Sequence, residues 1–201
     1  MEVTPARVVN RCAPMATNSS KPYQMQLIRE HGFRVPDTLI TNDPECVQRF
    51  QASRQRLIYK SASSVRSIVQ TLDPDDSDRL EHIRWCPTQF QEFVEGMNVR
   101  VHVVGDRLFA TRIETDAIDY RYASRHGKEA KLCPVELDEE VYHRCLRLAN
   151  SLGLPFAGLD LKITPHDEVF CFEVNPSPGF SYFQQETGEP IADAVADYLT
   201  G

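Results

Sequence analysis

The sequence predicts an α+β fold built from antiparallel hairpins and amphipathic helices. Two of the observations behind this prediction concern strands. Apolar and polar residues alternate along them, and the strands fall into pairs joined by short turns. The paired strands are Val99–Val104 with Arg107–Glu114, and Leu159–Thr164 with Val169–Asn175. A third observation is a helix expected from Asp138 to Leu152, because its apolar residues fall on one stripe and Gly153 follows it.

The remaining elements are expected from shorter signals. Ser19 or Ser20 can cap a first helix, and Asn42 or Asp43 can cap a second. In chain order, these elements are a strand and loop within residues 1–19, a helix from Lys21 or Pro22 to His31, strand 37–41, helix 43–53, strand 56–61, a surface loop with a short helix at 72–81, strand 88–94 and a helix from Pro190.

Composition restricts the class of protein. The 201 residues, 41% apolar and 25% charged, suffice for one domain or two packed subdomains. A net charge of −7 argues against a dedicated nucleic-acid-binding protein. No apolar run has membrane-spanning length, and the N-terminus lacks the apolar core of a signal peptide. The six cysteines form no CxxC pair, so we interpret them as reduced thiols of a cytoplasmic protein.

The second hairpin places two carboxylates face to face. If Thr164 pairs with Val169, Asp160 lies directly opposite Glu173, and Asn175 adds an amide oxygen to the same face. The same register forms three apolar pairs: Leu159 with Val174, Leu161 with Phe172 and Ile163 with Phe170. Facing carboxylates repel unless a cation or proton lies between them, and these oxygen donors suit Mg²⁺ better than Zn²⁺. The alternative is a polar face that simply meets water.

The motif EVNPSPGF after GLDL closely resembles the closing motif of ATP-grasp enzymes, particularly the RimK-like branch. The resemblance extends over roughly residues 16–200. It implies an ATP-grasp fold in which two α+β subdomains, about 20–93 and 94–201, hold Mg-ATP, while 1–19 is an N-terminal strand or loop remnant. RimK-like enzymes usually carry a further domain ahead of this point. We therefore expect an ATP-grasp domain alone, with a separate chain as a candidate source of that domain.

The resemblance also assigns nucleotide contacts. QEFVEGMNVR resembles the interdomain hinge, so Glu92, Phe93 and Val94 are implied to hold adenine. Asn98 stands where the family usually has a ribose-binding aspartate, and an amide can also hydrogen-bond a hydroxyl.

Phosphate contacts are implied at two lysines and at a serine-rich turn. Lys21 and Lys60 resemble the nucleotide-contacting lysines of the family. Ser63 and Arg66 lie where the family has a glycine-rich loop over the phosphates. Judged without the resemblance, Lys60 is simply a solvated lysine at the end of a strand.

Three arginines are candidates for stabilising the transferred phosphoryl group. Arg100 and Arg112 lie on the first hairpin, where a solvated strand arginine is the alternative interpretation of each. Arg121 lies in Asp119-Tyr120-Arg121-Tyr122, which resembles the D-(F/W/Y)-R stretch of RimK-like and microviridin-type peptide ligases.

The leading hypothesis is an ADP-forming carboxylate–amine ligase that uses ATP with Mg²⁺, or Mn²⁺ in its place. Such an enzyme activates a carboxylate as an acyl phosphate for attack by an amine or another nucleophile. The resemblance favours a carboxylate on a peptide or protein, because this branch often modifies peptides. The alternatives are a non-catalytic accessory protein that binds nucleotide and peptide, and an ATP-grasp kinase. Neither nucleic acid nor membrane is an expected partner, and a homo-oligomer is compatible with the sequence.

Overall fold

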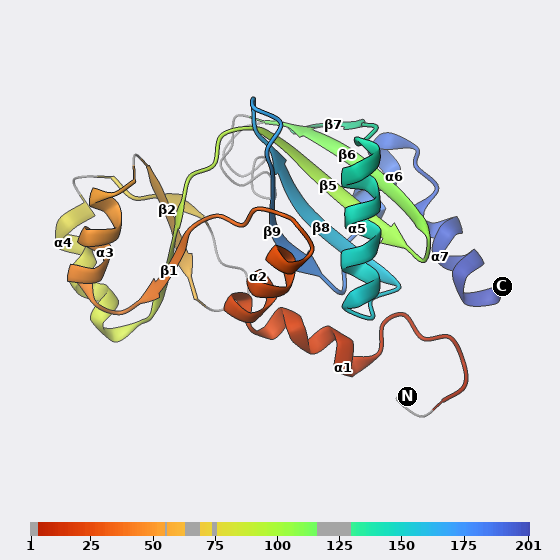
Figure 1. The fold of residues 1–201 in the computed structure, drawn as a ribbon, viewed down its shortest axis with the longest axis horizontal. Coiled ribbons are helices and arrows are strands. Elements are labelled where there is room, and N and C mark those ends of the chain that lie inside the picture. The colour runs from red at the N-terminus through yellow and green to blue at the C-terminus, as the bar shows by residue number, and fades with distance from the viewer. Residues whose placement is uncertain (1–3, 55, 63–68, 74–75, 116–129) are drawn as a thin grey trace. The chain divides into compact units, whose positions relative to one another are not determined.

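A computed structural model describes residues 4–54, 56–62, 69–73, 76–115 and 130–201 (Figure 1). The predictions for Ser63, Arg66 and Arg121 lie outside these residues. The chain divides into a larger unit, Met1–Val35 with Glu95–Glu114 and Ala130–Gly201, and a smaller unit, Pro36–Val94 with Thr115–Glu129. Each unit has its own antiparallel sheet and helices, which confirms the α+β class. No helix among the described residues is both long and apolar enough to cross a membrane.

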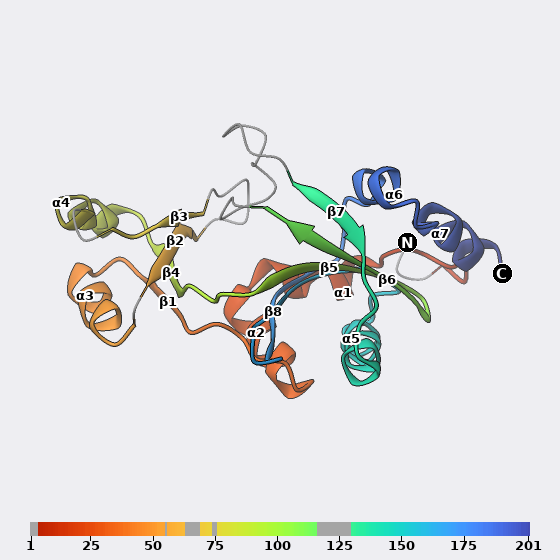
Figure 2. The ribbon, with the colours of Figure 1, turned by 90° about the horizontal axis from the view of Figure 1, so that it is seen from above.

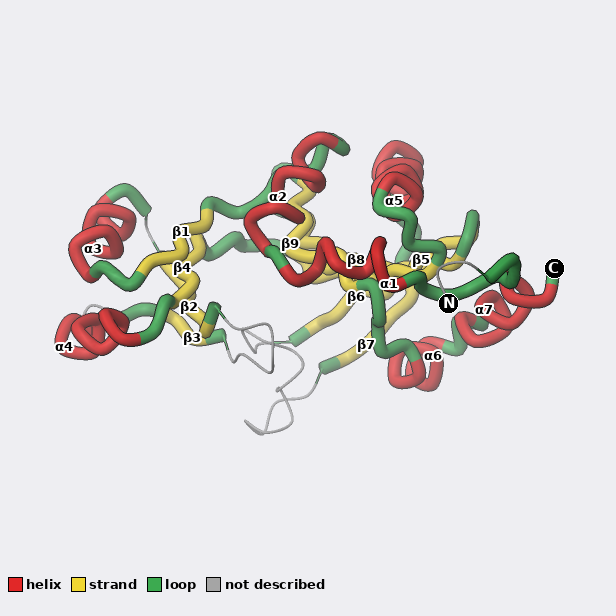
Figure 3. Tube along the Cα trace, turned by 90° about the horizontal axis from the view of Figure 1, so that it is seen from below, coloured by secondary structure: helices red, strands yellow, loops and turns green. Residues whose placement is uncertain are grey.

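The larger unit is a five-stranded antiparallel sheet with helices on both faces. Its strand order is β7-β6-β5-β8-β9, with β7 Lys131–Pro134, β6 Arg107–Glu114, β5 Met97–Val104, β8 Phe156–Ile163 and β9 Val169–Asn175. Helices α2 (Lys21–Glu30) and α5 (Glu139–Ser151) cover one face, and α6 (Ser181–Thr187) and α7 (Ile191–Thr200) lie on the other (Figures 2 and 3). The sheet is therefore the middle layer of three.

Alternation along β5 separates the core from the polar face of the sheet. Val99, Val101 and Val103 are buried in one cluster with Leu148 of α5. Arg100, between them, points to the opposite face because successive strand residues alternate. The predicted cap of α5 is present, with the Asp138 carboxylate accepting from the Glu140 amide at 2.9 Å.

The predicted register of the β8–β9 hairpin is confirmed in one half and wrong in the other. Asp160 pairs with Glu173 and Leu159 with Val174, as expected. Beyond them Leu161 pairs with Cys171 instead of Phe172, because a bulge at Phe172 adds one residue to β9. The bulge turns Cys171 into the core, where it is fully buried.

The smaller unit is a four-stranded sheet with its own core. The strand order is β1-β4-β2-β3, with β1 Thr38–Thr41, β4 Thr88–Glu92, β2 Leu57–Ser61 and β3 Gln70–Thr71. Helix α3 (Pro44–Ala52) is capped by Asp43, whose carboxylate accepts from the Glu45 amide at 2.9 Å. Helix α4 (Ser77–Leu80) and the 3₁₀ helix Glu81–Trp85 complete it. Its core residues are Val47, Leu57, Leu72, Leu80, Ile83 and Phe90.

Several sequence expectations differ from the structure. The strand expected within residues 1–19 is wrong for the described part, which holds a short helix α1 (Cys12–Met15) and a 3₁₀ turn Ala16–Ser19. Strand β7 and helix α6 were not predicted. The division into units also differs from 20–93 and 94–201, because Met25, Ile28 and Phe33 pack into the core of the larger unit.

Candidate functional site

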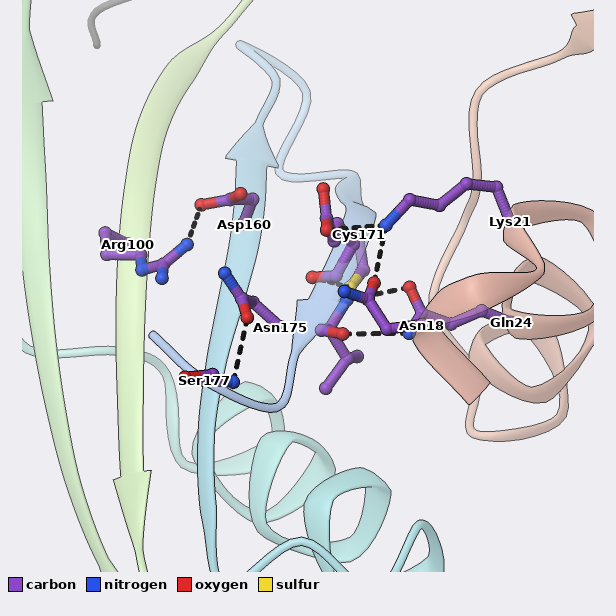
Figure 4. A network of polar contacts seen from close by, with 10 residues as sticks. Asn18, Lys21, Gln24, Arg100, Asp160, Cys171, Asn175 and Ser177 are labelled. Carbon is purple, nitrogen blue, oxygen red and sulfur yellow. Dashed lines mark hydrogen bonds and ion pairs between the residues drawn. The ribbon is translucent and has the colours of Figure 1, made fainter. Parts of the chain in front are cut away.

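Asp160 and Glu173 stand opposite each other, and each carboxylate is held by its own cation (Figure 4). Arg100 Nη1 donates to Asp160 Oδ1 at 2.6 Å, and Lys21 Nζ donates to Glu173 Oε1 at 2.5 Å. Both carboxylates are partly exposed, with 32% of the Asp160 side chain and 24% of the Glu173 side chain accessible. The repulsion expected from the sequence is thus balanced by two side-chain cations.

Asn175 follows two residues after Glu173 on the same face of β9. Its Oδ1 accepts from the Ser177 amide at 2.9 Å, which fixes the direction of the side chain (Figure 4). Within the described ranges no group of three His, Cys, Asp or Glu side chains is placed to hold a metal ion. Asp160, Glu173 and Asn175 are not such a group, because one of the three is an asparagine. Each of the two carboxylates has a second oxygen besides the one bonded to its cation. These hard donors fit Mg²⁺ that retains several waters.

Lys21 reaches Glu173 because α2 is anchored to the edge of β9. Gln24 is buried, and its side-chain amide forms a pair of hydrogen bonds with the Val174 backbone, at 2.8 Å to the carbonyl and 3.1 Å from the amide. Asn18 Oδ1 accepts from Lys21 Nζ at 2.5 Å. Sequence reasoning missed Asn18 and Gln24. Gln24 could have been found from the sequence, because it is a glutamine on the apolar stripe of a helix and a buried amide needs hydrogen-bond partners.

Arg100 is almost fully buried beside a glycine. It lies opposite Asp160 in the β5–β8 register, with its guanidinium carbon 5.9 Å from the centre of the Phe183 ring. A Cβ added to Gly158 would lie 2.8 Å from that carbon and 2.6 Å from Pro178 Cβ. The absence of a side chain at Gly158 therefore lets Arg100 pass over β8. Asn98 lies two residues before Arg100 on the same strand face.

Arg112 is placed differently from Arg100. It pairs in register with Val99, a core residue on the α5 side of the sheet. Directly paired residues share a face, so Arg112 lies on the face opposite to Arg100 and Asp160. It is partly exposed and forms an ion pair with Glu114, with Nη2 2.5 Å from Oε1. The structure brings Arg100 to the carboxylate pair and does not bring Arg112 there.

The predicted adenine-binding residues are at the end of β4 in the smaller unit. The Glu92 amide donates to Asp37 O at 3.0 Å, and Glu92 Oε1 accepts from the Asp37 amide at 2.9 Å. Phe93 has the Arg56 guanidinium 4.0 Å above its ring. Val94 is buried, and Lys60 near the end of β2 is partly buried. The assignment of these residues to nucleotide stays a prediction.

Solved structures with the same architecture define the class of protein. The chain superposes on the ATP-grasp ligase PsnB, complexed with a phosphomimetic variant of minimal precursor, Mg and ADP, at a TM-score of 0.83 and 34% identity, covering 99% of this chain and 64% of that chain. It superposes on the macrocyclase MdnC of Microcystis aeruginosa MRC, bound with precursor peptide MdnA, at a TM-score of 0.83 and 25% identity, covering 95% and 63%. The fold is that of ATP-grasp proteins.

The chain belongs to the RimK-like ATP-grasp domain family, whose model matches residues 18–199. This confirms the resemblance read from the closing motif. Among curated proteins, N-acetylaspartylglutamate synthase A of Homo sapiens is 29% identical over 211 residues, covering 98% of this chain and 53% of the human protein. The chain thus spans about half the length of that relative.

Proposed function

We propose that this chain provides the ATP-grasp site of an ADP-forming ligase that activates a carboxylate as an acyl phosphate for an amine or another nucleophile. The observation that carries the proposal is the set of charged groups on one sheet face: the Asp160–Glu173 pair, each carboxylate bonded to a cation at 2.5–2.6 Å, with Asn175 beside them. Membership of the RimK-like family supports the same activity.

The proposed metal site consists of Asp160, Glu173 and Asn175. The chemistry expected of bound Mg²⁺ is neutralisation of charge on the transferred phosphoryl group. Arg100, buried against Asp160, holds a fixed positive charge close to the site where negative charge develops. Because its guanidinium is already oriented by Asp160, little reorganisation accompanies the reaction.

We assign nucleotide binding to Lys21, Lys60, Asn98 and Glu92–Val94. Ser63 and Arg66 are assigned to the phosphates, and Arg121 to the acyl phosphate, on their sequence motifs alone.

The proposed reaction has two balanced steps. A substrate carboxylate oxygen forms a bond to the γ-phosphorus while the bond from that phosphorus to the bridging oxygen of ADP breaks. The nucleophile nitrogen then bonds to the acyl carbon, phosphate leaves with the original carboxylate oxygen, and the nitrogen loses a proton. The products are the amide, ADP and phosphate.

We further propose a peptide or protein carboxylate as the substrate and the cytoplasm as the location. The similarity to PsnB and to MdnC, which was solved with a precursor peptide, supports a peptide. The buried thiols Cys145 and Cys171, which form no disulfide, support a reducing compartment. Cell fractionation would test the location, and recovery of the chain only from an oxidising compartment would contradict it.

Isotope transfer tests the reaction. Peptides containing Asp or Glu together with Lys, labelled with oxygen-18 in the side-chain carboxylates, are incubated with the chain, ATP and Mg²⁺. We expect one labelled oxygen in the released phosphate and ADP as the nucleotide product, and neither with Asp160→Asn. Label retained in a phosphorylated peptide would favour a kinase. Nucleotide and peptide binding without ADP formation would favour the accessory protein.

A further inference from the structure

The segment Pro176–Gly179, which follows Asn175 at the end of β9, is held at both ends by side chains from distant parts of the chain. Asn10 Nδ2 donates to Pro176 O at 2.5 Å, and His102 Nε2 lies 3.3 Å from Gly179 O. Between them, the Ser177 amide donates to Asn175 Oδ1. Pro176 and Pro178 have no N–H, so the backbone of this segment has few donors with which to hold itself.

His102 is the first of these two side chains. It lies on β5 two residues after Arg100, is fully buried, and meets the Phe183 ring edge-on with the ring centres 4.9 Å apart. Burial, with the Arg100 charge adding to it, lowers its pKa to about 4. The ring is therefore neutral at neutral pH, and its contact with a carbonyl assigns the proton to Nε2. Nδ1 is buried and has no hydrogen-bond partner in the described part of the chain.

Asn10 is the second side chain. Its Oδ1 accepts from the Phe156 amide at 3.1 Å, and its Nδ2 donates to Phe156 O at 2.6 Å as well as to Pro176 O. Both amide hydrogens are therefore used on backbone carbonyls. Asn10 joins the first residue of β8 to the residue that follows Asn175.

The segment Pro176–Gly179 also packs beside the Arg100 side chain. Pro178 packs over Gly158, where Arg100 crosses β8, since an added Cβ there would meet both side chains. Phe183, which contacts His102, lies near the same guanidinium. A shift of the segment would therefore move Asn175 and loosen the packing around Arg100.

We propose that His102 and Asn10 are positioning residues of the active site. By holding the Gly179 and Pro176 carbonyls, they fix the Asn175 side chain and keep Arg100 on Asp160. The predicted effect of these two residues on metal affinity rests on the proposed function, because it takes Asp160, Glu173 and Asn175 as the metal ligands. Their predicted effect on the conformation of Pro176–Gly179 does not depend on that function.

The test uses the whole 201-residue chain and two readouts. One is the hydrogen-exchange rate of the Ser177 amide, measured by NMR, which reports its bond to Asn175 without any ligand. The other is Mn²⁺ affinity, measured from the free-ion EPR signal. His102→Phe keeps an aromatic ring and removes the donor, Asn10→Ala removes the second donor, and His102→Gln restores a donor. Cys145→Ala is the matched control, because Cys145 is also fully buried but lies on the other face of the sheet.

We expect Ser177 exchange to rise about tenfold or more in His102→Phe and in Asn10→Ala. Mn²⁺ affinity should fall roughly tenfold in the same variants. His102→Gln should recover part of both losses, and Cys145→Ala should change neither beyond about twofold even if it lowers stability.

Unchanged Ser177 exchange in folded His102→Phe and Asn10→Ala would overturn the proposal. If His102→Phe fails to fold, Asn10→Ala and His102→Gln decide the outcome. The metal assignment can fail separately. It is rejected if the wild-type chain binds no Mn²⁺, or if Asp160→Asn binds Mn²⁺ as tightly as the wild type. In either case the exchange data still test the positioning role of His102 and Asn10.

Discussion

Arg100 contacts Asp160 across two paired strands, with Nη1 2.6 Å from Oδ1 and the guanidinium passing over Gly158. Asp160 and Glu173 face each other on neighbouring strands, yet each is neutralised by a different cation. The polar face of the sheet therefore carries fixed, compensated charges before any ligand binds.

Gly158→Ala should displace the guanidinium. The added Cβ would approach Arg100 Cζ to 2.8 Å and Pro178 Cβ to 2.6 Å, and both distances are too short for a Cβ contact, so the guanidinium and the proline both have to move. We expect kcat/KM for ATP-dependent ligation to fall about tenfold or more, because misplaced charge stabilises the transition state less. In an Arg100→Met background, where the guanidinium is already gone, the same change should have a much smaller effect. Fully additive effects in steady-state kinetics would contradict this account.

Removing the carboxylate pair should abolish the magnesium-dependent stabilisation by ATP. A ligand at about 100 times its Kd stabilises the folded state by roughly 2.7 kcal/mol, which raises Tm by several degrees. Asp160→Asn with Glu173→Gln should eliminate the part of this shift that requires Mg²⁺ while the apo chain stays folded. Glu186→Gln, at an exposed carboxylate of α6, serves as the control. An undiminished shift in the double variant, measured by differential scanning fluorimetry, would reject the metal set.

Lys21→Met should separate metal binding from turnover. Lys21 occupies Oε1 of Glu173, so its ammonium competes with a metal ion for that carboxylate. We expect Mn²⁺ alone to bind a few-fold more tightly in the variant, whereas kcat/KM for ATP should fall because the cation proposed to bind phosphate is lost. EPR titration and phosphate release measure the two quantities. Weaker Mn²⁺ binding in Lys21→Met would contradict the competition.

Acidification should destabilise the chain through His102. Its folded-state pKa of about 4 lies below the ordinary value of 6.5, so the unfolded chain binds a proton first. Stability is therefore lost as the pH falls from 6.5 towards 4, and the loss levels off below that range. At 1.36 kcal/mol per unit, His102 contributes roughly 2–3 kcal/mol to the difference between about pH 7 and about pH 4.5.

Urea unfolding of wild type and His102→Phe at both pH values measures this contribution. Carboxylates also titrate in the range, but they do so in both proteins, so the difference isolates His102. We expect the variant to lose less stability on acidification than the wild type. Equal losses would show that His102 is not buried as a neutral ring.

Much of the fold was predictable from residues close together in the sequence. Caps at Asp43 and Asp138 depend on amides two residues away, and both are present. Pairing of Asp160 with Glu173 depends on alternation and a short turn, so it too could be predicted. The closing motif Glu173-Val174-Asn175-Pro176 is a continuous stretch of the chain, so the family could be recognised from it without knowing the fold.

By itself, then, the sequence determined the α+β class, the facing carboxylates and the RimK-like family. The tertiary structure alone decided which arginine joins them, because β5 pairs with β8, a strand far along the chain, and this pairing sets Arg100 opposite Asp160, whereas Arg112 pairs with Val99 on the other side of the sheet. It alone showed that His102 and Asn10 hold the segment after Asn175. Those hydrogen bonds join residues 77 and 166 positions apart, and polar side chains chosen by such distant partners leave no periodic pattern along the chain.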